Sequence, residues 1–139
     1  MKSFSVFKTS PLFHTKAYEL GRVEEEKILP VLRAHFVDPT IDLLPEGATF
    51  DFHGDIGYIE FKRRYCSSWD HSDVVIGVPK IVGAHQLHAR GFDVYFVFHY
   101  DDGVFQWKFN PYETLRQGKI KEIRHYFIPR HCLSKFPDV

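Results

Sequence analysis

The sequence predicts a single α+β domain, with one sheet of about five strands and a helix before and after the central strands. Three observations indicate this class. Apolar residues recur at helical spacing in one segment, several shorter segments are rich in β-branched and aromatic residues, and Gly, Pro or Asp mark the boundaries of the elements. The chain has 139 residues, 44% of them hydrophobic, which is long enough for one domain to bury a core. We therefore expect one domain over residues 1–139.

The first helix is predicted over residues 17–36. Its apolar residues at helical spacing are Leu20, Val23, Ile28, Val31, Leu32 and Phe36. Pro30 lies inside this segment and is expected to kink or divide the helix, because proline removes a backbone donor. Residues 37–47 read as a loop, with Pro39 and Pro45 as breaks.

Two strands are predicted next, over residues 48–52 and 57–65, as a hairpin around the turn at 53–55. An irregular run rich in Ser and Asp follows the second strand. Residues 73–77 are then a candidate for a short buried strand. These segments account for the strands expected before the second helix.

The second helix is predicted over residues 80–90, because Pro79 stands where a helix begins and Gly91 where it ends. Residues 94–100 and 104–109 are the clearest hairpin of the sequence, joined by Asp-Asp-Gly. The many aromatic residues of this hairpin are typical of a sheet core.

Charge is distributed unevenly in a chain with 18 Lys and Arg against 18 Asp and Glu. Residues 34–61 contain six acidic residues and no Lys or Arg, and Lys62-Arg63-Arg64 follows directly. Residues 111–139 are predicted to be a basic C-terminal extension of a core at about 17–110, forming a helix or an edge strand. On charge alone the pattern favours two ordinary solvated faces, and the alternative is a metal site beside a phosphate-binding surface. Zero net charge argues against a histone-like coat for nucleic acid.

The sequence also bears on location. No window approaches eighteen uninterrupted apolar residues, so a membrane span is not expected. The first residues contain no apolar run long enough for a signal peptide, and two cysteines cannot build a disulfide framework. We expect a cytoplasmic protein without a membrane partner.

The candidate catalytic and metal-binding residues lie in the hairpin over residues 50–62. In its second strand, period two sends Ile59 and Phe61 to one face and Glu60 and Lys62 to the other. Asp51 on the first strand can approach Glu60. Two converging carboxylates repel each other, and a divalent cation such as Mg²⁺ relieves that repulsion. A neighbouring lysine can orient water and offset charge on a phosphate, so this set suits metal-assisted phosphodiester hydrolysis.

In the order of its elements and in this motif, the chain resembles the PD-(D/E)XK nuclease superfamily over residues 18–109. The family core is restriction-endonuclease-like, a mixed sheet in the order helix, three strands, helix, strand, with acid-x-Lys on the third strand. The resemblance implies that Asp51 and Glu60 bind Mg²⁺ or Mn²⁺, that the backbone carbonyl of Phe61 is a further ligand, and that Lys62 is the catalytic lysine. Phe50 replaces the usual proline before the aspartate, and Asp55 in the turn is the rival for the Asp51 role.

Glu25 is expected to assist catalysis. Gly21, Glu25, Ile28 and Leu32 match the spacing of a first-helix pattern in Holliday-junction resolvases and phage endonucleases. Helical geometry instead puts Glu24 nearer the middle of the apolar face. A third interpretation is that these glutamates only form an acidic cluster near the helix N-terminus.

Nucleic-acid contacts are expected from Arg63 and Arg64, which leave the sheet beside the proposed metal. Lys80 resembles a basic residue that family members place at the start of the second helix, where phosphate binds readily. A lone surface lysine explains Lys80 equally well.

The favoured hypothesis is a Mg²⁺- or Mn²⁺-dependent deoxyribonuclease of phage or mobile-element type. It would be structure-selective or low in sequence specificity. A homodimer is one of the assemblies that the sequence leaves open. Such a protein would act in the host cytoplasm. The alternative is a non-catalytic α+β module of the same fold that binds nucleic acid or protein, with Glu60 and Lys62 only an ion pair. A third hypothesis is a zinc-bearing structural protein. Its candidate ligands are Cys66, His71, His131 and Cys132.

Overall fold

Two sheets of unequal size organise the computed structural model, which describes residues 16–137. The larger sheet has six strands in the order β1-β2-β3-β5-β6-β9, and the smaller has three in the order β4-β8-β7. The elements in chain order are α2 (Lys16–His35), β1 (Asp42–Leu43), β2 (Phe52–Gly54), β3 (Gly57–Arg63), β4 (Asp73–Gly77), α3 (Val78–Ala89), β5 (Val94–Tyr100), β6 (Gly103–Lys108), β7 (Arg116–Ile120), β8 (Ile123–Pro129), the 3-10 turn η2 (Arg130–Cys132) and β9 (Ser134–Lys135).

The predicted α+β class is confirmed, and the larger sheet is mixed because β3 pairs with β5 in parallel while its other pairs are antiparallel. The prediction of a single sheet of about five strands is wrong. The segment at 73–77 is a strand, as expected, but it pairs with β8 in the smaller sheet. The C-terminal residues are strands, and β9 extends the larger sheet by pairing with β6.

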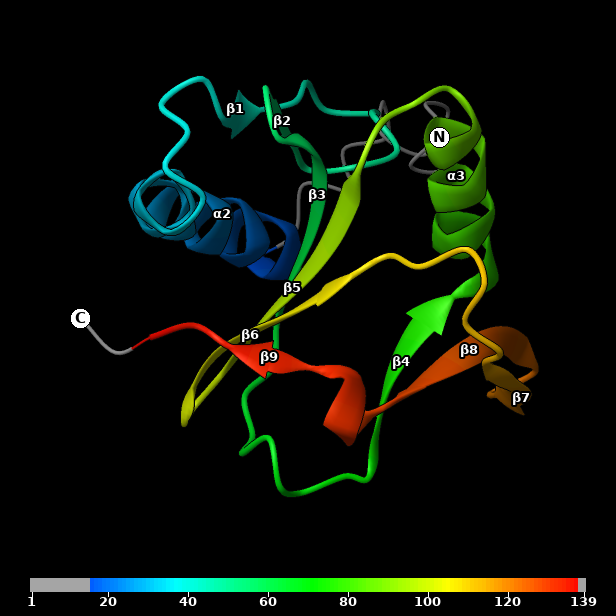
Figure 1. Cartoon of the computed structure of the whole chain (residues 1–139). Helices are drawn as coiled ribbons and strands as arrows, with labels where there is room; N and C mark the ends of the chain where they lie inside the picture. The colour runs from blue at the N-terminus through cyan, green and yellow to red at the C-terminus, as the bar shows by residue number, and fades with distance from the viewer. Residues whose placement is uncertain (1–15, 138–139) are drawn as a thin grey trace.

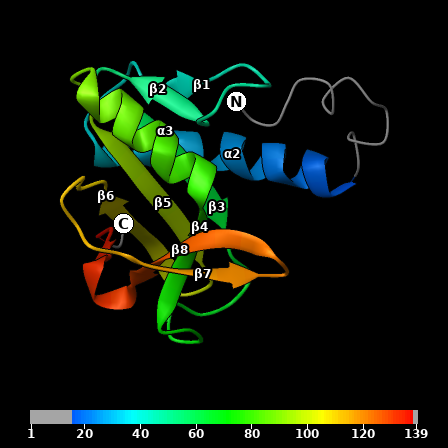
Figure 2. The ribbon, with the colours of Figure 1, turned by 90° about the vertical axis from the view of Figure 1, so that its right-hand side faces the viewer.

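Each face of the larger sheet is covered by different elements. In Figure 1 the sheet is seen between α2 and α3, and in Figure 2 α3 and the β7–β8 hairpin lie in front of it with α2 behind. The core under α2 contains Ile28, Leu32, Ile41, Phe52, Ile59, Phe61, Val97 and Phe136. The core under α3 and the smaller sheet contains Phe50, Val74, Ile81, Ala84, Val94, Phe96, Phe98, Trp107 and Ile128, among others. Successive residues of β3 and β5 therefore enter different cores.

Both helices form where they were predicted, with ends shifted by one or two residues. Pro30 does not divide α2. It is exposed, and the helix continues past it to His35. Helix α3 has Pro79 in its first turn, and Gly91 follows its end with φ +92°.

The first hairpin is shorter than predicted. Strand β2 covers only Phe52–Gly54, and the turn lies at residues 55–56 because Gly54 pairs with Gly57. Gly57 has φ +125°, and a Cβ there would lie 2.2 Å from the carbonyl oxygen of Asp93. Only glycine suits this position, and it brings the start of β3 against the start of β5.

The crossover from β3 to β5 passes through β4 and α3. Strand β4 ends at Gly77 and α3 begins at the next residue, so no loop separates them. The first turn of α3 lies against the middle of β3, because Lys80 in that turn contacts Glu60, which pairs with Phe96 of β5.

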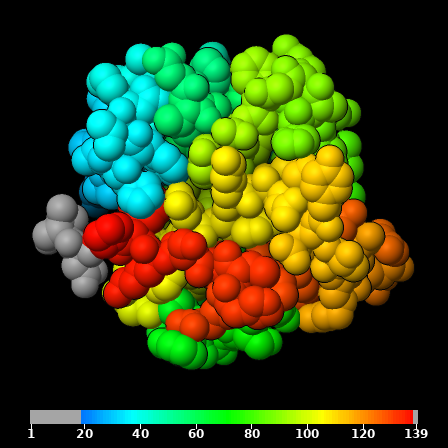
Figure 3. Space-filling model, viewed as in Figure 1, coloured from blue at the N-terminus to red at the C-terminus, as the bar shows by residue number. Residues whose placement is uncertain are grey.

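The chain after residue 110 covers much of the lower part of the face shown in Figure 3. Among residues 16–137, the two α-helices are too short or too polar to cross a membrane. The expectation about a signal peptide concerns residues 1–15, which lie outside the described part of the chain.

Candidate active site

A buried carboxylate marks the α3 face of β3. Glu60 is 3% exposed, and its two carboxylate oxygens face two lysines. Lys80 Nζ lies 3.3 Å from Oε1, and Lys62 Nζ lies 3.7 Å from Oε2. A buried carboxylate costs free energy unless cations or donors compensate it, and both lysines do so here.

Lys80 belongs to this site rather than to the outer surface. From the first turn of α3, its ammonium contacts Glu60 and donates to the backbone carbonyl of Thr49. Helix α3 approaches this segment closely, since a Cβ at Gly83 would lie 3.3 Å from Thr49 and from Phe50. The sequence placed Lys80 at the helix start but missed its contact with Glu60. That contact depends on β4 entering α3 without a loop.

Asp51 lies where β2 and β3 stop pairing. Its backbone N–H donates to the carbonyl of Ile59 at 3.0 Å, and its Oδ2 accepts the backbone N–H of Phe61 at 2.9 Å. Asp51 is 4% exposed, and its carboxylate therefore lies beside the peptide bond that joins Glu60 to Phe61. The N–H and C=O of one strand residue point to the same edge, so the Phe61 carbonyl also points toward Asp51.

These groups match the donor chemistry of a hard divalent cation. Mg²⁺ prefers carboxylate and carbonyl oxygens and keeps several waters. The Asp51 carboxylate binds the N–H of the peptide bond that joins Glu60 to Phe61, and the Phe61 carbonyl belongs to the next peptide bond along β3. Within residues 16–137 no group of three or more His, Cys, Asp or Glu side chains gathers as metal ligands. By their chemistry, Asp51, Glu60 and the Phe61 carbonyl are the groups that could hold Mg²⁺ or Mn²⁺, with water as the remaining ligands.

The structure does not bring the other candidate acids to this pair. Glu25 lies on α2, against the opposite face of the sheet, and bonds to Arg22 at 3.1 Å. Glu24 accepts a hydrogen bond from the Tyr65 hydroxyl at 3.4 Å. Asp55 is exposed in the turn, where its backbone N–H donates to Thr40.

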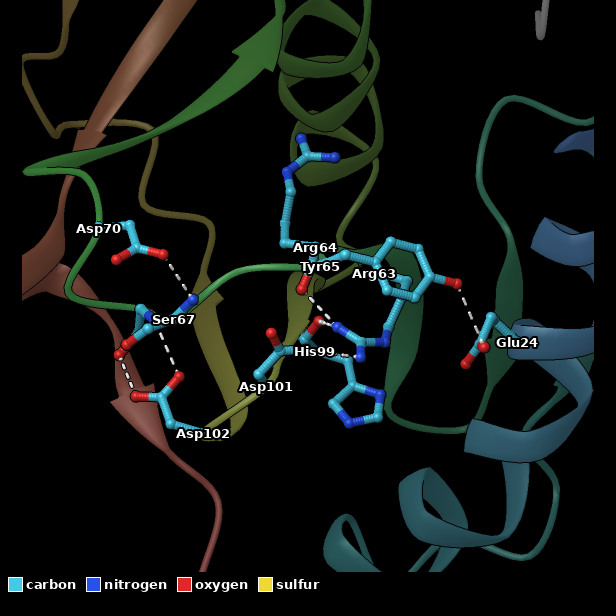
Figure 4. Close-up of polar contacts among 10 residues, drawn as sticks. Glu24, Arg63, Arg64, Tyr65, Ser67, Asp70, His99, Asp101 and Asp102 are labelled. Atoms are coloured by element: carbon cyan, nitrogen blue, oxygen red, sulfur yellow. Dashed lines mark hydrogen bonds and ion pairs between the residues drawn. The ribbon is translucent and has the colours of Figure 1, made fainter.

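The two arginines after the motif have different surroundings (Figure 4). Arg63 binds Asp101 at 2.9 Å and the carbonyl of His99 at 3.0 Å, and its guanidinium lies 4.2 Å from the centre of the Tyr65 ring. Arg64 points away from these groups. Arg63 is thus engaged in contacts within the protein, whereas the side chain of Arg64 is better placed to bind a ligand.

Two other carboxylates each fix a loop through hydrogen bonds. Asp38 accepts hydrogen bonds from Thr40 and from the backbone N–H of Ile56, and the Thr40 hydroxyl is the main cause of the lowered pKa of Asp38. Asp102 accepts hydrogen bonds from the hydroxyl and the N–H of Ser68, which lower the pKa of Asp102 in the same way. Both carboxylates are satisfied by neutral donors, unlike Glu60.

The zinc hypothesis finds no support in the arrangement of its ligands. Cys66, His71, His131 and Cys132 all lie within the described residues, and no three of them gather as a metal-binding group. Cys132 is half-buried, and this burial raises the pKa of its thiol.

A scan against protein-family models, a search of curated proteins and a search of solved structures each found no match to this chain. A function for the site therefore follows from its own contacts, burial and topology.

Proposed function

We propose that this protein is a metal-dependent nuclease that hydrolyses phosphodiester bonds in DNA. One observation carries the proposal. The buried carboxylate of Glu60 lies next to a peptide bond that also holds the carboxylate of Asp51, and Lys62 projects from the same strand face, with its side chain 48% exposed. Two carboxylates with a solvent-accessible lysine are what hydrolysis of a phosphodiester requires.

The topology supports assignment to the restriction-endonuclease-like core of the PD-(D/E)XK superfamily. One helix precedes an antiparallel meander of β1, β2 and β3, and a second helix leads to β5, which is parallel to β3. The acid-x-Lys motif, Glu60 to Lys62, lies on the third strand of this meander. Strand β4 is an addition to that order, because it pairs outside the larger sheet.

Each residue of the site has a separate task. A bound Mg²⁺ or Mn²⁺, held by Asp51, Glu60 and the Phe61 carbonyl, would polarise the phosphate and an attacking water. Lys62 reaches solvent and can orient the water or offset charge on the phosphate. Lys80 is more enclosed, and its contacts with Glu60 and Thr49 fix the carboxylate in place. Lys80 is thus a positioning residue.

Low sequence specificity is supported by the arrangement of the helices. Within residues 16–137 both α-helices pack against the sheet, and neither is free to enter a major groove as a recognition helix. We therefore propose that the enzyme recognises the shape or the unpaired state of DNA.

The test is a cleavage panel of supercoiled, linear, single-stranded and four-way-junction DNA, with Mg²⁺, Mn²⁺ or EDTA. Lys62→Ala and Asp51→Asn are each expected to lower cleavage at least about 100-fold. Lys108→Ala is the matched control, because Lys108 is similarly exposed and lies 3.6 Å from Asp93. It should cut like the wild type.

Cleavage that survives in Lys62→Ala and Asp51→Asn would overturn the assigned site. No cleavage under any condition, with DNA binding that ignores divalent ions and the loss of Asp51, would instead favour the non-catalytic binding module.

A further inference from the structure

A cavity of about 430 Å³, open to solvent on one side, lies between the end of β3, strand β4 and the β7–β8 hairpin. Its lining includes Arg64, His71, Val74, Tyr100, Ile120 and Phe127. The volume falls within the range of small-molecule sites, and the mixture of apolar walls with a few polar groups is typical of them. The smaller sheet builds one side of this cavity.

Arg64 connects the cavity to the candidate active site. Side chains alternate along a strand, so Arg64, just past β3, continues the face of Glu60 and Lys62. It lies two residues beyond Lys62, or about 6.6 Å along an extended chain, on the order of one nucleotide step. Among residues 16–137 its guanidinium has no hydrogen-bond or ion-pair partner, and Figure 4 shows it directed away from the Arg63 contacts.

The surroundings of Arg64 leave the cavity with a positive charge and an aromatic wall. Asp73 is the one carboxylate among its described lining residues, and Arg116 neutralises it at 2.9 Å. Tyr100 is buried and Phe127 half-buried. Burial raises the pKa of Tyr100, while the nearby charge of Arg64 acts in the opposite direction, so guanidinium and phenol lie within electrostatic range.

Resting on the nuclease function proposed above, we propose that this cavity binds one unpaired nucleotide of the substrate strand, adjacent to the scissile phosphate. Arg64 holds the phosphate, because a guanidinium matches phosphate geometry with two parallel hydrogen bonds. The base packs against the apolar wall and against the part of Phe127 that Arg116, 4.1 Å from the centre of that ring, leaves uncovered. A base cannot enter such a cavity while it is stacked in a duplex, so the substrate is single-stranded, flapped or otherwise unpaired DNA.

The experiment measures binding of a labelled oligothymidylate and of a duplex by fluorescence anisotropy in EDTA, where hydrolysis does not occur. Arg64→Ala removes the charge, and Arg90→Ala removes one equal charge outside the cavity as its control. Ile120→Trp fills the cavity from its lining, and the control is Ile123→Trp. Ile123 is the cross-strand partner of Ile120 but is not a lining residue. Both isoleucines are exposed, so neither change disturbs the core.

We expect Arg64→Ala and Ile120→Trp each to weaken binding of the single strand at least about fivefold, with both controls within about twofold of the wild type. Wild-type binding that is equally tight for duplex and single strand would overturn the inference. The inference would also be overturned if Arg64→Ala and Ile120→Trp both bound the single strand as tightly as the wild type. The same holds if a cavity variant and its control lost the same affinity. Thymidine monophosphate that binds as tightly as the oligonucleotide would mean a free-nucleotide site instead of a strand site.

The two proposals can fail separately. Metal-dependent cleavage together with unchanged single-strand binding in both cavity variants would leave the nuclease and overturn the nucleotide site. Single-strand binding that needs Arg64 and Ile120, without cleavage under any metal condition, would leave the nucleotide site and overturn the nuclease.

Discussion

The two faces of β3 have opposite physical character. Toward α2, Ile59 and Phe61 pack with Ile28 and Leu32 in an apolar core. Toward α3, the intervening residue Glu60 is equally buried but lies between two lysines. A buried ion pair usually stabilises a fold no more than apolar residues of the same volume would. Burial of apolar surface therefore explains the α2 face, whereas stability alone does not explain the ion pairs on the α3 face.

The largest expected effect on stability belongs to the α2 face. Phe61→Ala should lower the free energy of unfolding by about 3–5 kcal/mol, because it empties a buried aromatic site. Its neighbour on the strand is the matched control. Lys62→Ala should change stability by less than about 0.5 kcal/mol, since its side chain is half exposed. Urea denaturation measures both, and equal losses would contradict the contrast between the faces.

Removing one cation from the α3 face should have a smaller cost. Lys80→Met deletes the closest cation to Glu60 and the hydrogen bond to Thr49, and we expect a loss of about 1–3 kcal/mol. Lys108→Met, which breaks an exposed pair with Asp93, should lose less than about 1 kcal/mol. If Lys80→Met were as stable as the wild type in urea, Lys80 would not be what compensates Glu60.

Converting the α3 face into an apolar one should recover that stability without recovering activity. The double variant Glu60→Leu, Lys80→Met should be more stable than Lys80→Met alone, and within about 1 kcal/mol of the wild type or above it. Metal-dependent cleavage should be lost, because Glu60 is a proposed ligand. A double variant that is stable and still cuts would remove Glu60 from the site.

The smallest effect concerns Asp38, a buried carboxylate with neutral donors. Its pKa is lowered from 3.8 in the folded protein, chiefly by the Thr40 hydroxyl. Its contribution to stability is therefore fully present above about pH 3.8 and declines as the pH falls through the lowered value. Asp38→Asn should melt below the wild type at neutral pH, and the difference should shrink in acid. A difference in melting temperature between the two proteins that stays constant from neutral to acidic pH would contradict this prediction.

Local features of the fold could be predicted from the sequence because they depend on neighbouring residues. The helical spacing of Ile28 and Leu32, and the alternation that separates Glu60 from Phe61, both hold in the structure. The Asp51 carboxylate reaches the N–H of Phe61, next to Glu60 in the chain, because a short turn joins their strands. These relations involve residues close together in the chain.

Long-range relations could not be predicted in this way. The pairing of β4 with β8 joins segments separated by about fifty residues, for example Val74 with Ile128, and no local pattern encodes that partner. The contact between Lys80 and Glu60 could not be predicted either, because it depends on the path of the whole crossover from β3 to β5. Arg63 and Arg64 look alike in the sequence, and only the position of Asp101 on another hairpin separates their roles.

The larger sheet begins and ends with strands of two residues, β1 and β9. A long unpaired edge offers its N–H and C=O groups to other chains, and this is a common route to aggregation. Edges as short as these offer few such groups, so the larger sheet is protected against growth by addition of strands from a second molecule. If the protein forms a dimer, we expect its contacts to come from parts other than the edges of the larger sheet.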